Sequence, residues 1–311
     1  MPNWLCLLLS NRQFYKEGCV VLYRIGIIGT ENSHALAFAK YFNLPDPETG
    51  KMHHEDVRVT AILGTDQAAN ETIVQETGVK FTAETVEDLL DRVDAVMITC
   101  RKGSEHMAYA LPFVERCIPL FIDKPFVSDP AEADALMARI QKYNCPVMGG
   151  SACKYLPGIK EIKNLVTELR AQDKFMGASI SFRISIDSPY DGIYFYSPHL
   201  VEMCLEAFGF DVKKIQAMRT GPNLLVNVQY EHDAVSLQFV GAGKQSCLVY
   251  GADENYHFDI DTTGLYALEA APFAELLHGT HDSLTAEQLV KPVHMIAAIQ
   301  KAMLSGETVL M

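Results

Sequence analysis

Hydrophobic residues in the first half of the chain occur in short, nearly unbroken runs, and amphipathic segments separate these runs. The runs predict strands at residues 23–29, 57–63, 94–99, 118–122 and 146–148. The intervening segments, with apolar residues at helical spacing, predict helices at residues 33–42, 67–77, 85–91, 104–116 and 130–143. Asp129 is expected to cap the last of these helices. Short apolar strands that alternate with helices are typical of a parallel sheet covered on both faces.

The pattern changes after Gly149 and Gly150. A helix is predicted at 157–170. Hydrophobic and polar residues then alternate in longer segments, which predict antiparallel strands at 175–186, 214–220, 224–232, 234–243 and 246–251. A helix at 196–208 interrupts them, and a last helix at 286–304 has an apolar face that could pack back on the first domain. We expect an N-terminal extension at 1–21, an α/β domain at 22–149 and an α+β domain at 150–311.

Composition narrows the class of partner. The chain has 311 residues, a formal net charge of −13 and no long basic run, so neither nucleic acid nor a membrane surface is an expected partner. A small-molecule substrate is expected instead. The eight cysteines show neither zinc-ligand nor C-x-x-C spacing, which indicates reduced thiols in a cytoplasmic protein.

The first predicted strand leads through a tight turn into a helix, where the pyrophosphate of a dinucleotide normally binds. The fingerprint G-x-G-x-x-G starts at Gly29, but Glu31 and His34 replace its second and third glycines. Backbone N–H groups and a helix N-terminus can still bind phosphate, with Glu31 directed to solvent. We therefore predict a dinucleotide in an altered pose, the alternative being that none binds. The expected contacts in this turn come from Gly29, Thr30, Glu31, Asn32 and Ser33.

Two further strand ends carry candidate residues. Asp123 and Lys124 follow the strand at 118–122, at the sheet edge where ligands bind in parallel α/β proteins. A desolvated lysine can act as an acid or base, whereas the alternative is a surface lysine in a turn. After the strand at 94–99, Arg101 offers positive charge to a phosphate or a carboxylate, unless it belongs to a solvated basic turn.

The helix at 196–208 places His199 and Glu202 on one face, with tyrosines just upstream. A lone helical histidine can equally be a core or capping residue. The pairs His53–His54 and His278-x-x-His281 lack a cysteine or carboxylate cluster at ligand spacing, so no metal site is expected.

In this order, "IGIIG", "DAVMIT", "IDKP", "HLVE" and the closing "SGETVLM" resemble motifs of the Gfo/Idh/MocA oxidoreductases, the family of glucose–fructose oxidoreductase and inositol dehydrogenase. The resemblance covers residues 22 to 311. It implies a Rossmann domain that binds NAD or NADP, then an α+β domain with an open, mainly antiparallel sheet that binds substrate and forms a homo-oligomer. Sugars, polyols and related acids are the implied substrates.

The resemblance also implies roles for individual residues. Lys124 matches the family lysine that contacts substrate and nicotinamide, and His199 matches the family histidine that handles the substrate hydroxyl proton, so both are implied catalytic residues. The implied cofactor-binding residues beyond the first turn are Asp66, Thr99, Arg101, His106, Asp123 and Lys124. The implied substrate-binding residues are Lys124, Tyr155, Tyr190, Tyr194, Tyr196 and His199.

Several positions depart from the family pattern. Phe195 stands where the family has an Asp four residues before the histidine. The ribose-binding Asp would fall near Gly64, and Asp66 is the nearest carboxylate. We predict an NAD(P)-dependent oxidoreductase. The alternative is a non-catalytic dinucleotide- or sugar-binding sensor, and a cofactor-assisted elimination or glycoside cleavage is a third option.

Overall fold

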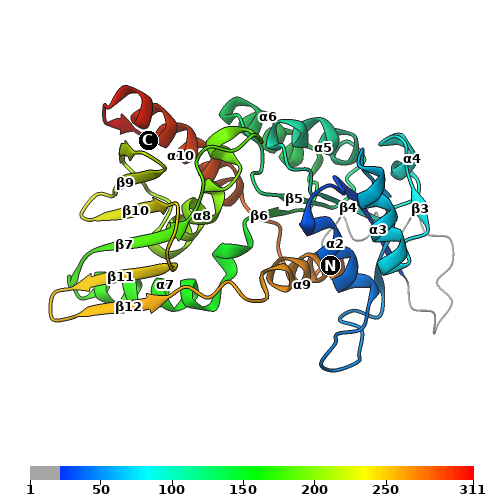
Figure 1. Cartoon of the computed structure of the whole chain (residues 1–311), viewed down its shortest axis with the longest axis horizontal. Helices are drawn as coiled ribbons and strands as arrows, with labels where there is room; N and C mark the ends of the chain where they lie inside the picture. The colour runs from blue at the N-terminus through cyan, green and yellow to red at the C-terminus, as the bar shows by residue number, and fades with distance from the viewer. Residues whose placement is uncertain (1–21) are drawn as a thin grey trace. The chain divides into compact units, whose positions relative to one another are not determined.

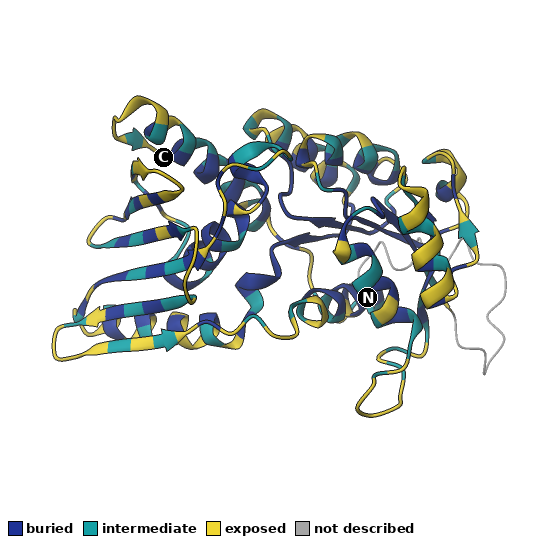
Figure 2. Ribbon diagram, in the orientation of Figure 1, coloured by how far each residue is buried: buried dark blue, intermediate teal, exposed yellow. Residues whose placement is uncertain are grey.

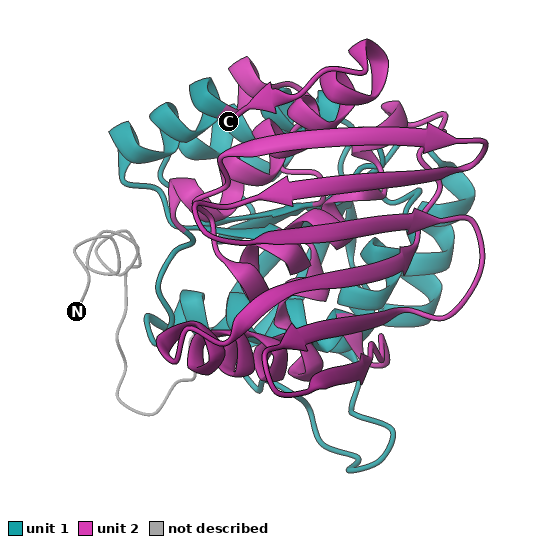
Figure 3. Ribbon diagram, turned by 90° about the vertical axis from the view of Figure 1, so that its left-hand side faces the viewer, with its two compact units in different colours: residues 1–123, 134–149, 266–284 teal, residues 124–133, 150–265, 285–311 magenta. Residues whose placement is uncertain are grey.

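The computed structural model describes residues 22–311; the extension expected at 1–21 lies outside the described residues. The chain forms two compact units, which Figure 3 shows in different colours. Unit 1 contains the chain up to Asp123 together with residues 134–149 and 266–284. Unit 2 contains residues 124–133, 150–265 and 285–311. The boundaries between the two units follow contacts rather than chain order, so each unit consists of three segments that are separated in the sequence.

Unit 1 is built on a six-stranded sheet in the order β3-β2-β1-β4-β5-β6, and the pairs formed by β1 to β5 are parallel. Its strands are β1 (Tyr23–Ile28), β2 (Val57–Leu63), β3 (Phe81–Thr82), β4 (Ala95–Ile98), β5 (Leu120–Asp123) and β6 (Val147–Gly150). The expected α/β Rossmann architecture is thus confirmed.

The helices of unit 1 lie on both faces of this sheet. They are α2 (Ser33–Asn43), α3 (Gln67–Thr77), α4 (Glu87–Leu90), α5 (His106–Val114), α6 (Pro130–Tyr143) and α9 (Leu265–His278). Figure 1 shows α5 and α6 on one side of the strands and α2 and α9 on the other. Ile27, Phe38, Phe121 and Phe273 are among its fully buried side chains. Apolar residues on both faces of each strand are what a sheet covered on both sides requires.

Unit 2 has a seven-stranded sheet in the order β12-β11-β7-β10-β9-β8-β13. The strands are β7 (Phe175–Arg183), β8 (Lys214–Thr220), β9 (Asn223–Gln229), β10 (Ala234–Val240), β11 (Ser246–Gly251), β12 (Asn255–Asp259) and β13 (Val309–Leu310). The helices α7 (Pro157–Ala171), α8 (Ser197–Phe208) and α10 (Ala286–Ser305) pack against its strands. Figure 2 shows burial alternating along these strands.

Three features of the fold differ from the sequence-based expectation. The strand expected at 175–186 ends at Arg183, and it pairs in parallel with β10 rather than antiparallel. The helix α9 and the short strands β3, β12 and β13 were not expected at all. The last helix, α10, belongs to unit 2 and packs on β8 and α8, so it is α9 that unit 1 takes from the late part of the chain.

The start of α6 was predicted correctly. Asp129 Oδ1 accepts hydrogen bonds from the backbone N–H groups of Ala131 (2.8 Å) and Glu132 (3.1 Å), as the predicted cap requires. Within residues 22–311, none of the helices is long and apolar enough to cross a membrane.

Two of the described cysteines, Cys117 and Cys145, are free thiols that interact with one another. Cys117 precedes β5 and Cys145 precedes β6, which is the neighbouring strand of the sheet. A hydrogen bond from the buried Cys145 thiol stabilises the Cys117 thiolate, which lowers the pKa of Cys117 to about 7, although burial opposes this shift. The same contact and burial raise the pKa of Cys145. Cys117 is half-buried, whereas Cys100, Cys153, Cys204 and Cys247 are buried.

We expect Cys117 to be the first described cysteine that iodoacetamide alkylates. A lowered pKa leaves about half of the thiol ionised at pH 7, against about 3% for an ordinary thiol, so its alkylation rate should be at least tenfold higher at that pH. Mass spectrometry of peptides over a pH series measures this. Cys145→Ala should move the midpoint of the Cys117 profile upward by more than one pH unit, and an unmoved midpoint would contradict the assigned cause.

Candidate functional site

The turn after β1 lies against the turn after β4 in unit 1. Gly29 has φ +94°, and a Cβ at this position would lie 2.2 Å from the backbone nitrogen of Cys100. Only glycine fits such a close approach together with a positive φ. The first glycine of the nucleotide-binding fingerprint is therefore required by the fold itself.

Side chains fix the start of α2 at this edge. Asn32 is its N-cap: Oδ1 accepts from the backbone N–H of His34 (3.3 Å), and Nδ2 donates to the carbonyl of Thr99 (3.1 Å). Thr99 Oγ1 in turn donates to the carbonyl of Gly29 (2.9 Å). These bonds hold the N-terminus of α2 at the carboxyl end of β1 and β4, where a helix dipole and backbone N–H groups favour an anion.

The Glu31 carboxylate does not point to solvent as expected. Its Oε1 accepts a hydrogen bond from the backbone N–H of Arg101 (3.0 Å), in the turn after β4. The expectation overlooked this donor because the two residues lie on different turns. The negatively charged Glu31 side chain is therefore bonded to the Arg101 N–H, a backbone donor near the N-terminus of α2.

The end of β2 is closed by a second set of bonds. Thr30 Oγ1 donates to Asn70 Oδ1 (2.6 Å), and Asn70 Nδ2 donates to the carbonyl of Gly64 (2.8 Å). A Cβ on Gly64 would lie 1.7 Å from Thr30 Oγ1, so no side chain fits there. The carboxylate of Asp66 accepts from the backbone N–H of Ala69 (3.1 Å) and caps α3.

A pocket of about 350 Å³ adjoins this region of unit 1. It is lined by Gln67, Asn70, Glu71, Val74, Gln75 and Thr82, which come from α3 and β3. His106, another expected cofactor residue, is fully buried, and its Nε2 donates to the carbonyl of Cys100 (2.9 Å). That imidazole therefore shapes the turn after β4 from within the protein.

The end of β5 brings together three residues that sequence spacing did not connect. His34 Nδ1 lies 2.7 Å from Asp123 Oδ2. Glu269 of α9 completes the group, and one ligand atom from each of the three lies within 4.8 Å of the others. Asp123 is 0% and Glu269 1% exposed, so both carboxylates are buried in unit 1.

In unit 2, Lys124 is buried beside aromatic rings. Its Nζ lies 4.1 Å from the centroid of the Phe195 ring and 5.7 Å from that of Tyr196. The ammonium also donates to the carbonyl of Phe195 at 3.5 Å. The Phe195 ring thus gives the Lys124 side chain a cation–π contact in place of an ion pair.

His199 is held in place by the turn after β6. Its Nδ1 lies 2.7 Å from Ser151 Oγ and 3.5 Å from Cys153 Sγ. The rings of Tyr196 and His199 have centroids 6.3 Å apart. Lys124 and His199 therefore both neighbour the Tyr196 ring. When the Nδ1–H of His199 donates to Ser151 Oγ, the neutral imidazole has its unprotonated nitrogen at Nε2.

A buried ion pair fixes the same turn to α8. Lys154 Nζ lies 2.9 Å from Glu202 Oε2, and the same carboxylate oxygen accepts from the backbone N–H of Ser151 (2.9 Å). Sequence reasoning identified Glu202 as sharing a face with His199 but missed Ser151, Cys153 and Lys154. Their position directly after a strand, behind Gly149-Gly150, was the available signal.

The four expected tyrosines differ in their surroundings. Tyr190 packs on Phe195 with ring centroids 5.1 Å apart, and Tyr196 packs on the same ring at 4.5 Å. The Lys154 ammonium lies 5.2 Å from the Tyr155 ring centroid. Tyr194 is buried, and burial raises its pKa to about 12. Tyr190 and Tyr196 are thus grouped with Lys124, whereas Tyr194 belongs to the core.

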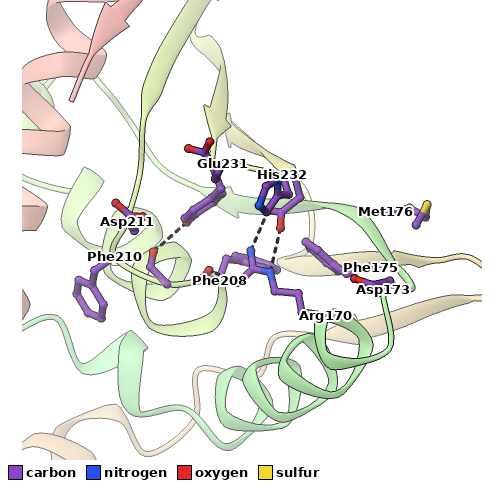
Figure 4. Close-up of a pocket in the computed structure, with 12 residues that line it drawn as sticks. Arg170, Asp173, Phe175, Met176, Phe208, Phe210, Asp211, Glu231 and His232 are labelled. Atoms are coloured by element: carbon purple, nitrogen blue, oxygen red, sulfur yellow. Dashed lines mark hydrogen bonds and ion pairs between the residues drawn. The ribbon is translucent and has the colours of Figure 1, made fainter.

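A larger pocket, of about 540 Å³, lies elsewhere on unit 2 and includes none of the expected site residues. Arg170 is one of the residues that line it (Figure 4), and its guanidinium donates two hydrogen bonds, of 2.8 and 3.0 Å, to the Asp233 carboxylate. The guanidinium also donates to the carbonyl of Phe208 and lies over the Phe175 ring. Because these partners occupy the guanidinium, we assign Arg170 a structural role.

Comparison with solved structures shows the same fold. The chain is similar to GenD2 from gentamicin A biosynthesis in complex with NAD, with 13% identity, a TM-score of 0.77, and coverage of 96% of this chain and 99% of that one. It is also similar to myo-inositol 2-dehydrogenase from Lactobacillus plantarum (14%, 0.78, 93% and 99%). Scyllo-inositol dehydrogenase from Lactobacillus casei with NAD(H) and scyllo-inositol is a third (15%, 0.76, 93% and 99%).

No sequence of a curated protein matches the chain. One family model does match: residues 23–151 correspond to the oxidoreductase family with the NAD-binding Rossmann fold. This match covers the sheet of unit 1 and the turns that carry Gly29, Thr99, Asp123 and Lys124. Over these residues, the chain matches the Gfo/Idh/MocA oxidoreductase family model with its NAD-binding Rossmann fold.

Proposed function

We propose that the protein is an NAD-dependent dehydrogenase that oxidises a secondary alcohol of a sugar, a polyol or a related hydroxy acid, or reduces the matching ketone. The observation that supports this most is the grouping of Lys124 and His199 around Tyr196, in a chain whose residues 23–151 match a family model of NAD-binding oxidoreductases. A cation and an imidazole that both neighbour one tyrosine ring suit the handling of a hydroxyl proton.

The residues divide the work as follows. The nicotinamide, when bound, exchanges hydride with the substrate carbon. His199 takes the hydroxyl proton at Nε2, while its Nδ1 faces Ser151. The Lys124 ammonium stabilises the negative charge that develops on the substrate oxygen. Tyr190 and Tyr196 supply hydroxyl groups and flat apolar surfaces, which suit a polyhydroxylated ring.

The N-terminal turn of α2 and the pocket beside Asn70 are proposed to hold the two ends of the cofactor. The pyrophosphate would lie at the first turn of α2, near Thr30, Asn32 and Ser33, and the adenosine at the pocket on α3. Asp66 is exposed and could contact the ribose only by giving up part of its cap. We propose NAD rather than NADP as the cofactor, because the matching family model describes an NAD-binding fold.

The second candidate is a non-catalytic sensor that binds dinucleotide or sugar. Phe195 favours it, because the position lacks the carboxylate that the catalytic members carry near the histidine. The contact between Glu31 and the Arg101 N–H favours weak cofactor binding and so supports the same reading. Retention of Lys124 and His199 favours the enzyme.

The open face of the unit 2 sheet is proposed as the surface on which a second copy of the chain packs. Strand register places Met218, Leu225, Gln238, Ser181 and Ser246 in one row across the sheet. Met218 is 61% and Leu225 41% exposed. Two neighbouring exposed apolar side chains beside polar ones on a sheet face suit an interface with a like surface.

Replacing the Glu31 charge should strengthen NADH binding. Glu31→Gln keeps an acceptor for the Arg101 N–H but removes a negative charge near the phosphates. Removing this repulsion should stabilise the complex by about 1 kcal/mol, which lowers Kd about fivefold. Glu31→Gly should strengthen binding at least as much, because it also frees the N–H donor. Fluorescence titration with NADH and NADPH measures this, with Glu48→Gln as a matched exposed control. Absence of binding for either nucleotide at millimolar concentration would remove the dehydrogenase proposal.

Lys124→Met and His199→Asn should lower turnover without loss of fold. Proton handling by a positioned side chain contributes about 10²–10⁴-fold, so kcat should fall by that range for Lys124→Met and by a similar or smaller factor for His199→Asn. NADH production with a panel of inositols, sugars and hydroxy acids measures the rates. Lys163→Met, which removes an exposed lysine of unit 2, serves as the control. If wild-type protein binds NADH but oxidises none of the panel, the sensor function is favoured.

Charge on the open sheet face should dissociate the proposed oligomer. Met218→Glu with Leu225→Glu places two carboxylates on the row described above, and self-association then requires their burial. Size-exclusion chromatography with light scattering should show the wild type as an oligomer and the double variant as a monomer. Leu304→Glu, at an exposed site on α10, should leave the mass unchanged. A monomeric wild type at micromolar concentration would refute this interface.

A further inference from the structure

We propose that His34, Asp123 and Glu269 form a binding site for one divalent transition-metal ion, of which Zn²⁺ fits the ligand set best. The site goes beyond the proposed dehydrogenase function and lies entirely within unit 1. Its three residues come from the first turn of α2, the end of β5 and the middle of α9. Sequence spacing could not reveal it, because each element contributes a single ligand.

The geometry suits a single ion. One nitrogen and two carboxylate oxygens lie within 4.8 Å of one another, and His34 Nδ1 already lies 2.7 Å from Asp123 Oδ2. Zinc bonds nitrogen and oxygen ligands at about 2.0–2.2 Å, so adjacent ligand atoms lie about 3.3 Å apart around a tetrahedral ion. Small rotations of the Asp123 and Glu269 side chains would bring all three atoms to that spacing.

The surroundings make a compensating cation favourable. The Phe38 ring packs on those of His34, Phe121 and Tyr266, with centroids 6.2, 5.3 and 6.0 Å away. Asp123 and Glu269 are buried in this part of unit 1, and a divalent ion carries the two positive charges that match two carboxylates.

The ligand types select among metals. Imidazole suits zinc and other first-row transition metals, whereas magnesium prefers six oxygens and retains several waters. The His34 side chain is 18% exposed, while the two carboxylates are buried, so the fourth position and the route of entry lie on the His34 side. The bound ion would connect α2, β5 and α9 and so stiffen the turn that carries the candidate pyrophosphate site.

The test is metal uptake by the whole protein after treatment with a chelator and removal of the chelator. Titration with Co²⁺, a spectroscopic substitute for Zn²⁺, should give a visible absorption band that saturates at one ion per chain. Excess Zn²⁺ should abolish the band, and the melting temperature should rise by about 3 °C or more when Zn²⁺ binds tightly. Neither readout uses cofactor or substrate, so failure here is distinct from failure of the proposed function.

Variants assign the ligands. His34→Gln and Glu269→Gln should each lower Co²⁺ affinity at least tenfold and remove the thermal shift, whereas His53→Gln, which alters an exposed histidine–aspartate pair, should change neither. The wild-type titration stands by itself if a variant fails to fold. The proposal is overturned if the wild type takes up no Co²⁺ or Zn²⁺ at about 100 μM, a concentration well above the Kd of structural zinc sites. Uptake that both ligand variants retain would overturn it equally.

Discussion

The close approach of two turns at the carboxyl end of the parallel sheet governs the geometry of unit 1. Because Gly29 has no room for a Cβ against Cys100, the chain after β1 must turn at this point. The hydrogen bonds from Asn32 to the Thr99 carbonyl and from Thr99 to the Gly29 carbonyl are possible only at that separation. The same proximity brings Glu31 within reach of the Arg101 N–H. The start of α2 therefore forms around one backbone contact.

Much of this fold follows from local sequence pattern. Strands such as Tyr23–Ile28 and Ala95–Ile98 are mostly apolar. This local pattern indicates a buried strand without any knowledge of the strands with which it pairs. The parallel pairing of β7 with β10 could not be inferred, since the pairing partner of a strand leaves no mark in its own alternation. The helix α9 was missed because it is apolar around much of its surface and contains Pro272, so it lacks a clear helical face.

The candidate site divides in the same way. Lys124 and His199 stand in short motifs next to predictable elements, so sequence sufficed to select them. The groups that hold them did not follow: Ser151 contacts His199, and Lys154 contacts Glu202, across separations of nearly fifty residues. Such contacts depend on how the turn after β6 meets α8, which no local pattern encodes. The sequence shows that Phe195 departs from the family pattern, which has an Asp at this position. Only the structure shows that the Phe195 ring makes a cation–π contact with Lys124.

The tight fit of Gly64 against Thr30 makes these two positions interdependent in evolution. A side chain at 64 would overlap the Thr30 hydroxyl, which itself bonds Asn70. An acidic residue at the end of β2 would also meet Asn70 Oδ1 and Thr30 Cβ, which lie 2.8 Å from the position of its own Cβ. Replacements at positions 30, 64 and 70 should therefore have non-additive effects on the free energy of unfolding, which is the signature of coupled sites.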